Sequence, residues 1–413
     1  MIISTEEQLL DEMSGDSKAV IFGSGKVGRT MLRYFRSKKL LLAGIAAKNN
    51  TGVSLFEYKT KELSDFAGHT EDYTIFLCVR EEFQKEYREL AESLNFKKIR
   101  AIAYDLYVQL SVAENVHVDF LCAGFSKSGT TSLQTAFKKH PAICVPINKE
   151  SYYLRWRTQF EDAPERFKNR YFPNLEEGKI TGNIEPAYHD RAMDAYECFG
   201  KDLKIILMMR NPIDATYSNF KMLMKNPTTK HMVFYYLKHN KFHVDMFDNY
   251  LEDYIYNDVD MRYQYSKYVK EFIEYFGKDQ VKLIFFEEII KEPTRILDEV
   301  QEFIGAPNKK YKKLPKSNAA KFVSRNFIGA VINRYFYKKK IAMKAASVKQ
   351  MKRYWKIAHF FQKYTYVEND EKLPLESRKQ LRDFYAEGVH ELEEIAGRSL
   401  GDIWPDFKYS GKL

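Results

Sequence analysis

The chain has 413 residues, of which 45% are hydrophobic and 15% aromatic, and its formal net charge is +10 at pH 7. This length predicts about two domains, and the apolar content excludes a disordered chain. Acidic side chains within residues 1–16 disfavour a secretory leader, and no apolar run approaches the roughly 20 residues of a membrane-spanning helix. We therefore expect a cytoplasmic protein whose scattered cysteines are reduced core thiols: Cys78, Cys122, Cys144 and Cys198.

Residues 18–50 follow the pattern of a strand, a glycine turn, a helix and a second strand. Gly23, Gly25 and Gly28 match the GxGxxG spacing directly after the first strand, which is typical of a dinucleotide-binding half-domain. The second strand is followed by Lys48 and by no acid that would bind a ribose hydroxyl. We therefore interpret this half-domain as degenerate, with Lys48 able to meet a phosphate instead.

A third strand at 73–79, a helix at 81–94 and a short strand at 98–103 complete this part of the chain. We expect a small Rossmann-like α/β domain over residues 1–112, followed by a polar joint at 111–118. It resembles the Rossmann-like module often placed ahead of enzymes in bacterial surface-polysaccharide pathways. Its ligand stays open between a cofactor, a nucleotide-derived molecule without chemistry, and a purely structural or assembly role.

The stretch 118–141 predicts a second strand–loop–helix unit. An apolar run at 118–123 reads as a buried strand, a Gly/Ser/Lys turn follows, and Thr130 opens a helix. Backbone N–H groups, the helix dipole, hydroxyl groups and one lysine converge in such a turn. The stretch therefore predicts an anion site.

Two further apolar strands, at 204–209 and 281–286, are likewise each followed by a helix. We expect residues 113–413 to form a P-loop-like, three-layer α/β/α domain around a parallel sheet. Ligands of such sheets bind at the carboxyl ends of the strands, which is where the Lys127 loop and Arg210 lie.

A nucleoside triphosphatase loop fits these residues poorly. Gly124 and Gly129 have the right separation, but Thr130 follows them, and Lys127 lies two positions before the second glycine. Such an enzyme also needs an acid after a neighbouring strand to hold Mg²⁺, whereas Arg210 stands there. An arginine suits a phosphate, so we expect no metal in this site.

At these residues the sequence resembles the sulfotransferase family that uses 3′-phosphoadenosine-5′-phosphosulfate (PAPS). Residues 127–133 resemble its 5′-phosphosulfate loop, and Arg210-Asn211-Pro212 resembles its 3′-phosphate element. Residues 284–289 resemble a strand-and-acid segment of the family, and its closing Gly-Arg-x-Leu-x-x-x-Trp pattern stands at 397–404. The resemblance covers about 118–405 and implies sulfuryl transfer from PAPS by in-line displacement without a metal.

The family's mechanism implies a role for each basic residue. Lys127 would stabilise the leaving phosphate, and Arg210 would bind the 3′-phosphate with a hydroxyl contribution from Ser218. Alternatively, the threonines merely cap the helix and Arg210 is a surface ion pair. The remaining expected cofactor contacts lie on the loop, at the helix start and in a segment that resembles a closing loop: Ser128, Gly129, Thr130, Thr131, Ser132, Lys316 and Ser317.

The acceptor needs a base to remove its proton. Glu150, within residues 149–153, is the first candidate, because it matches the position where glycan sulfotransferases carry a catalytic glutamate; the alternative is a structural carboxylate paired with Lys149. Glu185 is the second candidate, because it stands beside a proline in a displaced version of another glycan-type pattern. His189 and His140 are weaker candidates, the latter as part of a helix stop.

The segment 308–367 is strongly basic. No Asp or Glu occurs from Phe303 to Val367, which hold seventeen Lys and Arg residues, so the rest of the chain is net acidic. Such a block predicts a surface for a polyanion or for anionic lipid headgroups, or else a solvated helical face. Because no nucleic-acid-binding module accompanies the block, we expect no specific nucleic-acid partner.

The acceptor class follows from two features of the family resemblance. Members that act on phenols and steroids carry Trp where Ser132 stands, which together with the Glu150 segment favours a glycan or glycolipid acceptor, such as a surface polysaccharide or its precursor. Two alternatives stay open: an enzyme that acts on a lipid or small alcohol while peripheral to the inner face of the membrane, and a non-catalytic nucleotide-binding scaffold. The sequence does not predict the oligomeric state.

Overall fold

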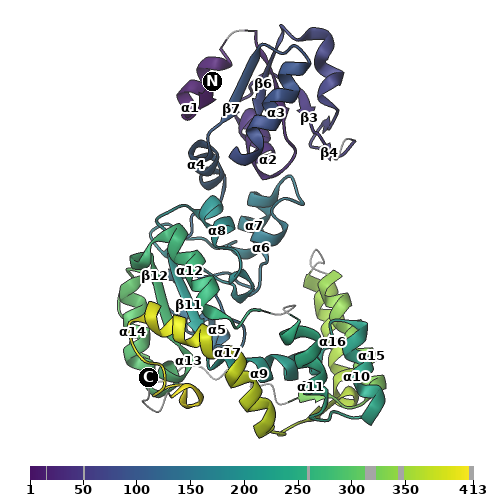
Figure 1. Cartoon of the computed structure of the whole chain (residues 1–413), viewed down its shortest axis with the longest axis vertical. Helices are drawn as coiled ribbons and strands as arrows, with labels where there is room; N and C mark the ends of the chain where they lie inside the picture. Colours follow the sequence, from purple (N-terminus) through teal and green to yellow (C-terminus); the bar gives the residue numbers. More distant parts are fainter. Residues whose placement is uncertain (15, 50–51, 258–260, 312–321, 343–347, 409–413) are drawn as a thin grey trace. The chain divides into compact units, whose positions relative to one another are not determined.

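The computed structural model describes residues 1–14, 16–49, 52–257, 261–311, 322–342 and 348–408 (Figure 1). The chain divides into two compact units. The first unit is built from Met1–Leu121, Cys144–Asn183 and Arg191–Leu203. The second is built from Cys122–Ile143, Ile184–Asp190 and Lys204–Leu413.

The N-terminal sheet is parallel throughout, in the order β1-β7-β6-β2-β3. Its strands are β1 (Ile2–Ile3), β2 (Lys18–Phe22), β3 (Leu42–Ala46), β6 (Tyr73–Leu77) and β7 (Lys98–Ile102). A separate antiparallel hairpin is formed by β4 (Ser54–Leu55) and β5 (Tyr58–Lys59). Since the chain leaves β2 towards β3 on one side and β6 lies on the other, the glycine turn after β2 sits at a topological switch point.

Alternate residues of β2 face two different cores, as expected for a sheet covered on both faces. Ala19 and Ile21 pack in one cluster with residues of α1 (Glu6–Glu12), α2 (Lys26–Ser37) and α4 (Tyr104–Glu114). Val20 and Phe22 pack in the other with residues of η1 (Leu63–His69) and α3 (Glu81–Ser93). This part of the chain is therefore a three-layer α/β/α arrangement. The remaining helices of the first unit are α6 (Tyr153–Trp156), α7 (Ala163–Tyr171) and α8 (Ala192–Phe199).

The second sheet has the strand order β12-β11-β8-β10-β9. The strands are β8 (Phe120–Gly124), β9 (Ile143–Cys144), β10 (Ile180–Ile184), β11 (Lys204–Met209) and β12 (Val281–Phe285). β11 and β12 pair in parallel, with Ile205 opposite Val281. Every residue of β8 is buried, which is typical of a strand covered on both faces.

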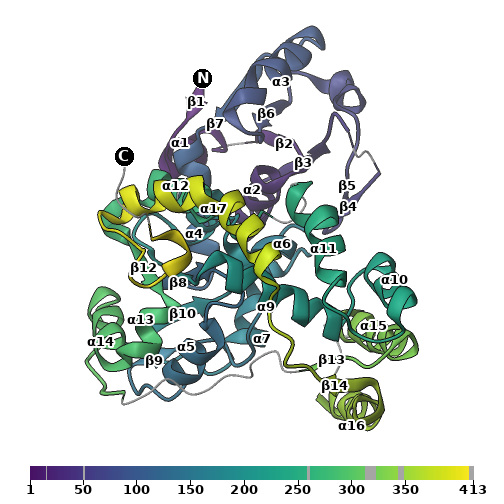
Figure 2. The same ribbon diagram turned by 60° about the horizontal axis from the view of Figure 1, so that its bottom comes forward.

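Most of the second unit is helical. Its helices before residue 311 are α5 (Thr130–Phe137), η2 (Pro186–Tyr188), α9 (Pro212–Lys225), α10 (Lys230–His239), α11 (Met246–Tyr250), η3 (Leu251–Tyr256), α12 (Tyr265–Phe276), η4 (Lys278–Gln280), α13 (Phe286–Lys291) and α14 (Pro293–Phe303). The later elements are β13 (Phe322–Ser324), α15 (Phe327–Ala342), α16 (Val348–Thr365), β14 (Tyr366–Glu368), α17 (Leu375–Ala396) and η6 (Pro405–Phe407). α15 and α16 pack together as a hairpin beside α10 (Figure 2).

The predicted parallel-sheet α/β fold class is confirmed, and each strand predicted in the two sheets is present. One local prediction is wrong in part: residues 111–114 belong to α4, and Ser111 is fully buried there, so they are not a polar joint. The domain boundary at residue 112 and the dinucleotide-binding type of the first domain stay predictions. All four cysteines are free thiols, and no helix among the described residues has the length and apolarity needed to span a bilayer.

Candidate active site

The loop between β8 and α5 turns through two left-handed residues. Lys127 has a φ of 69° and Gly129 a φ of 89°. A Cβ on Gly129 would lie 2.8 Å from a ring carbon of Phe286, so only glycine fits there. The left-handed backbone of Lys127 costs about 1–3 kcal/mol, a kind of strain that clusters at functional sites. Gly129 is also the N-cap of α5 and offers no side chain to that helix terminus.

Arg210 directly follows β11, the neighbour of β8 in the sheet. Its Nη1 donates a hydrogen bond to the carbonyl oxygen of Lys127 at 3.5 Å. Its guanidinium carbon lies 5.2 Å from the centroid of the Phe286 ring, within the range of a cation–π contact. The structure therefore brings together the lysine loop and the arginine, which the sequence placed after two different strands.

Tyr265 at the start of α12 holds the backbone of Arg210. Its hydroxyl donates to the Arg210 carbonyl oxygen at 2.8 Å and accepts from the Arg210 N–H at 3.5 Å. The ring packs edge-on against Phe125, at the entrance to the loop, with 4.6 Å between the centroids. Burial raises the pKa of Tyr265 well above its ordinary value, so the hydroxyl stays protonated and keeps donating.

Glu287 fixes the residue after Arg210. One carboxylate oxygen accepts the backbone N–H of Asn211 at 3.0 Å, and the other accepts the indole N–H of the buried Trp404 at 2.9 Å. Burial raises the pKa of Glu287, and these two hydrogen bonds oppose that shift. The C-terminal tryptophan therefore supports the Arg210 loop through a single carboxylate.

A second anchor holds the side chain of Asn211. Its amide nitrogen donates to Asp406 at 2.8 Å. Arg378 on α17 donates two hydrogen bonds to Asp406, at 2.7 and 2.6 Å, and one to Asp214 on α9 at 2.9 Å. Although burial alone would raise it, the pKa of Asp406 is lowered by its bonds from Arg378 and Asn211. Asp214 therefore takes part in an ion pair as well as lying in the first turn of its helix.

The other predicted cofactor residues occupy varied environments. Ser128, Thr130 and Ser132 are buried, and Thr131 is exposed. Ser218 is partly buried on α9, about two turns beyond the helix start. Lys316 and Ser317 lie outside the described residues.

The two candidate bases differ in burial. Glu185 is fully buried at the carboxyl end of β10, and its N–H donates to the Cys122 carbonyl oxygen at 2.9 Å, beside the strand that leads into the loop. Glu150 belongs to the first unit, is exposed, and has a left-handed φ of 65°. Its carboxylate accepts a hydrogen bond from the Tyr152 hydroxyl at 3.2 Å.

The two histidines also differ. Both ring nitrogens of His140 make hydrogen bonds to the backbone, which indicates a structural role. Its Nε2 lies 2.9 Å from the Pro307 carbonyl oxygen, and its Nδ1 accepts the Ala142 N–H at 3.1 Å. That pattern assigns a neutral ring protonated at Nε2. His189 packs against Tyr268 and Phe125, with ring centroids 4.9 and 5.6 Å away, so it lies beside the start of the lysine loop.

Sequence reasoning missed the residues that support Arg210. Tyr265 carries no motif that distinguishes it from the other tyrosines. Glu287 and Trp404 lie in segments whose family resemblance was visible, but their hydrogen bonds to the Arg210 loop were not. Such contacts join positions far apart in the chain, so neither local spacing nor periodicity can find them.

The family model for the sulfotransferase domain, which describes the sequences of that family, matches residues 117–393 of the chain. The chain is similar to the membrane-associated sulfotransferase kil1 of Dictyostelium discoideum, at 28% identity over 127 residues that make up 30% of this chain and 24% of that protein. It is also similar to heparan sulfate glucosamine 3-O-sulfotransferase 5 of Mus musculus, at 22% identity over 52% of this chain and 58% of that protein. The chain thus matches less than two thirds of either relative.

The chain is also similar to two solved structures. A sulfotransferase from Alicyclobacillus acidocaldarius is 19% identical with a TM-score of 0.43, over 70% of this chain and 99% of that one. A mouse sulfotransferase complexed with PAP is 18% identical with a TM-score of 0.33, over 49% of this chain and 64% of that one.

Proposed function

Because the chain belongs to the sulfotransferase domain family, we propose that it transfers a sulfuryl group from PAPS to a hydroxyl group of a saccharide. The observation that carries this proposal is the contact between Arg210 and the Lys127 loop, with 3.5 Å between guanidinium nitrogen and carbonyl oxygen. Two basic side chains at the carboxyl ends of neighbouring strands suit a nucleotide with two separate phosphate groups. PAPS is the donor that this family uses.

In the proposed complex, the 5′-phosphosulfate lies on the loop at the start of α5. The backbone N–H groups of the loop, the hydroxyl groups of Thr130 and Thr131, and Ser132 would bind it, because a helix N-terminus attracts anions. The planar guanidinium of Arg210 would bind the 3′-phosphate through two hydrogen bonds, and Ser218 would add a hydroxyl. Tyr265 and Glu287 act as positioning residues, since they hold the backbone on either side of the Arg210 peptide.

The reaction is an in-line displacement at sulfur. The acceptor oxygen forms a new S–O bond while the bond from sulfur to the bridging phosphate oxygen breaks. Negative charge grows on the departing phosphate, where the ammonium group of Lys127 would stabilise it, and 3′,5′-phosphoadenosine leaves. The acceptor proton passes to a carboxylate, and no step requires a metal.

Glu150 and Glu185 are the two candidates for that carboxylate. Exposure of Glu150 gives it access to a large acceptor, whereas Glu185 lies beside the reacting loop but is fully buried. Glu150→Gln and Glu185→Gln separate them, because loss of the base should lower kcat and remove the acidic limb of its pH profile. If a variant is less stable than the wild type but has the same pH profile of kcat, the carboxylate that it lacks has a structural role.

The direct test is transfer of radiolabelled sulfate from PAPS to a panel of acceptors. The panel contains heparan-type glycans, bacterial polysaccharides, glycolipids and small alcohols. We expect transfer to at least one saccharide, in line with the heparan sulfate relative. Tight binding of 3′,5′-phosphoadenosine without transfer to any acceptor would instead indicate a nucleotide-binding scaffold.

A specific observation favours action at a membrane surface, which is the second candidate setting. The α15–α16 hairpin exposes one apolar face on each helix: Ile328, Val331 and Tyr335, and Ile357, Phe360, Phe361 and Tyr364. Both sets follow helical spacing, and exposed Lys338, Lys339, Lys356 and Lys363 lie on the same two helices. Aromatic and aliphatic side chains among lysines are typical of surfaces that bind anionic headgroups from the cytoplasmic side.

Liposome co-sedimentation tests this surface. We expect binding to vesicles that contain phosphatidylserine, weaker binding at high salt, and a loss of about tenfold or more in a Phe360→Ser, Tyr364→Ser variant. Ile290→Ser is the matched control, since Ile290 is 59% exposed, as is Phe360, but lies on α13. Equal binding to neutral vesicles, or none, contradicts the membrane setting.

A further inference from the structure

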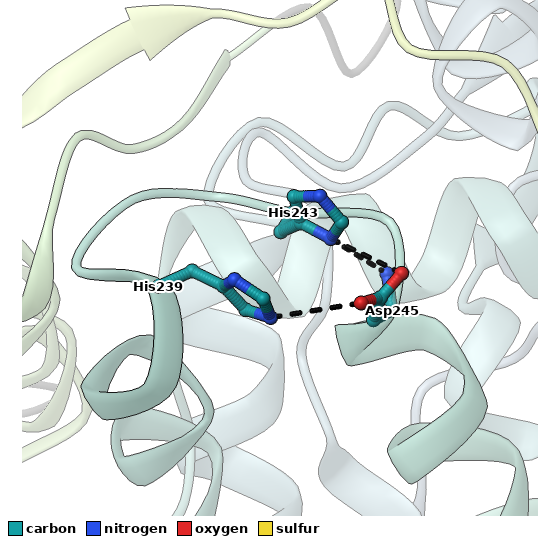
Figure 3. A group of neighbouring side chains, drawn as sticks. All are labelled: His239, His243 and Asp245. Carbon is teal, nitrogen blue, oxygen red and sulfur yellow. Dashed lines mark hydrogen bonds and ion pairs between the residues drawn. The ribbon is translucent and has the colours of Figure 1, made fainter.

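Two histidines and one aspartate meet where α10 ends and α11 begins (Figure 3). His239 is the last residue of α10, His243 lies in the connection, and Asp245 directly precedes α11. In the part of the chain that the structure describes, it is the one group of three His, Cys, Asp or Glu side chains whose donor atoms lie within 4.8 Å of one another. The phosphate loop and Arg210 contribute nothing to this group.

The connection is folded so that the two imidazole rings face each other. Asn240 has a left-handed φ of 47°, and its N–H donates to the Tyr236 carbonyl oxygen at 2.8 Å, which ends α10 and reverses the chain. Phe242, only 6% exposed, packs against Phe220 of α9 with ring centroids 5.6 Å apart. The rings of His239 and His243 consequently stack, with centroids 4.2 Å apart and planes 15° from parallel.

The donor atoms have separations close to those of a metal coordination sphere. The Nε2 of His239 lies 3.7 Å from one oxygen of Asp245, and the Nδ1 of His243 lies 3.2 Å from the other. Ligands about 2.0–2.2 Å from a tetrahedral zinc ion are about 3.4 Å from one another. Because an imidazole binds a metal in the plane of its own ring, the two rings must turn out of their stacked arrangement to direct both nitrogens at one ion.

The Nε2 atom of His239 points to a missing ligand. It is buried and makes no hydrogen bond to any described residue, and one oxygen of Asp245 lies 3.7 Å from it. A buried polar atom without a partner is costly, and such atoms are few in folded proteins. His243 makes only a long hydrogen bond through this side, since its Nδ1 accepts the Asp245 N–H at 3.3 Å. A metal ion would give Nε2 of His239 a partner and would replace the hydrogen bond that Nδ1 of His243 accepts.

We propose that His239, His243 and Asp245 bind a divalent transition-metal ion, with zinc as the best match. Two imidazole nitrogens and one carboxylate are borderline ligands that favour zinc, nickel or copper and disfavour the oxygen-seeking Mg²⁺ and Ca²⁺. The ion ties α10 to α11, and a water molecule completes its coordination. Since α10 packs against α15, the ion also restrains the helix that supports the α15–α16 hairpin. The neighbouring Lys238 and Lys241 are exposed, so solvent screens their repulsion of the ion.

The test is a titration of the full-length, chelator-treated protein with ZnCl₂ against a chromophoric competitor. We expect one ion per chain, and affinities at least about tenfold lower in His243→Ala and Asp245→Asn. Both side chains are partly exposed, at 38% and 49%, so these variants should fold. Co²⁺ gives a second readout, because visible absorption typical of a four-coordinate site should appear in the wild type and be lost in the variants.

His231→Ala is the matched control. His231 lies on the same helix and pairs with Asp253 at 2.6 Å, but it has no second histidine beside it. We expect this variant to bind zinc as the wild type does, and its melting temperature to rise with zinc by the same amount. Zinc uptake that is equal in the wild type and in His243→Ala and Asp245→Asn would overturn the proposal, as would no uptake at all.

Discussion

The molecule contains two turns of the same design, one after β2 and one after β8. In each, a buried parallel strand runs into a glycine-containing loop and then into a helix. In the first turn, Lys26 at the start of α2 is ion-paired with Asp194 and lies 3.2 Å from Glu197. In the second, Arg210 reaches the loop at 3.5 Å and forms no ion pair with any carboxylate of the described chain.

The two turns differ in whether acidic side chains of the protein itself neutralise the basic residue beside them. Gly28 packs so closely on Gly23 that a Cβ would lie 1.8 Å from its carbonyl oxygen, so the glycine spacing of the first turn serves packing between helix and strand. Although burial alone would raise it, the pKa of Asp194 is lowered by Lys26 and Arg157. Glycine spacing therefore positions a helix N-terminus, but the charges that the chain itself supplies decide whether an outside anion can bind there.

The largest effect is expected from removing the counter-charge of the first turn. Glu197 is 1% exposed and accepts hydrogen bonds from Arg157 at 2.7 Å and from the Tyr107 hydroxyl at 3.1 Å. Glu197→Ala leaves a buried guanidinium without its main partner, which should lower the free energy of unfolding by about 3–5 kcal/mol. Urea denaturation measures this loss.

The matched control for Glu197 is Glu57→Ala, which removes a carboxylate that is 56% exposed in an ion pair with Arg36. An exposed pair of this kind contributes about 0–1 kcal/mol. If Glu197→Ala and Glu57→Ala lowered the free energy of unfolding by the same amount, Glu197 would not be an important counter-charge beside the first turn.

In the second turn, Lys127→Ala should lower kcat for sulfuryl transfer by about 10²–10³-fold, as expected for the loss of one charge-stabilising donor. The exposed Lys139, just beyond the other end of α5, provides the control, since Lys139→Ala should transfer as the wild type does. Steady-state kinetics with PAPS checks both. Equal rates for the two variants would show that Lys127 is not aimed at the breaking bond.

Glu287→Gln should have a smaller effect, through the position of Arg210. The carboxylate accepts two N–H groups with two oxygens, whereas the amide has one acceptor oxygen and presents an NH₂ group to the second donor. We expect a loss of about 1–3 kcal/mol in stability, together with a higher KM for PAPS at nearly unchanged kcat. A fall in kcat with unchanged KM would instead assign Glu287 a part in the chemical step.

The smallest effect is expected for the stability that Asp406 contributes, which should be lost at acidic pH. Because the folded-state pKa of Asp406 is lowered from 3.8, its bonds to Arg378 and Asn211 stabilise the fold above that pH and are lost as the pH falls below it. The stability difference between the wild type and Asp406→Asn should therefore be constant near neutral pH and shrink below about pH 3.8. Urea denaturation over a pH series measures the difference, and a gap that persists into acid contradicts the assignment.

The sequence predicted those parts of the site that depend on local pattern. The strand before Lys127, the helix from Thr130 and the strand before Arg210 follow from apolar runs and glycines. Their proximity follows because parallel strands end at one edge of the sheet. The contacts of Trp404 with Glu287 and of Asp406 with Asn211 were not predictable, since they depend on how distant segments pack. His239, His243 and Asp245 stand in the sequence as H-x₃-H-x-D, but their meeting depends on the left-handed turn at Asn240, which this spacing does not reveal.

The most direct test of the central claim compares the binding of two nucleotides by calorimetry: 3′,5′-phosphoadenosine and adenosine 5′-phosphate, which lacks the 3′-phosphate. A guanidinium that binds the 3′-phosphate should make the bisphosphate bind about 10–100-fold more tightly in the wild type. In Arg210→Ala the two affinities should become nearly equal. If Arg210→Ala keeps the full preference for the bisphosphate, Arg210 does not bind the 3′-phosphate and the two-phosphate site is wrongly placed.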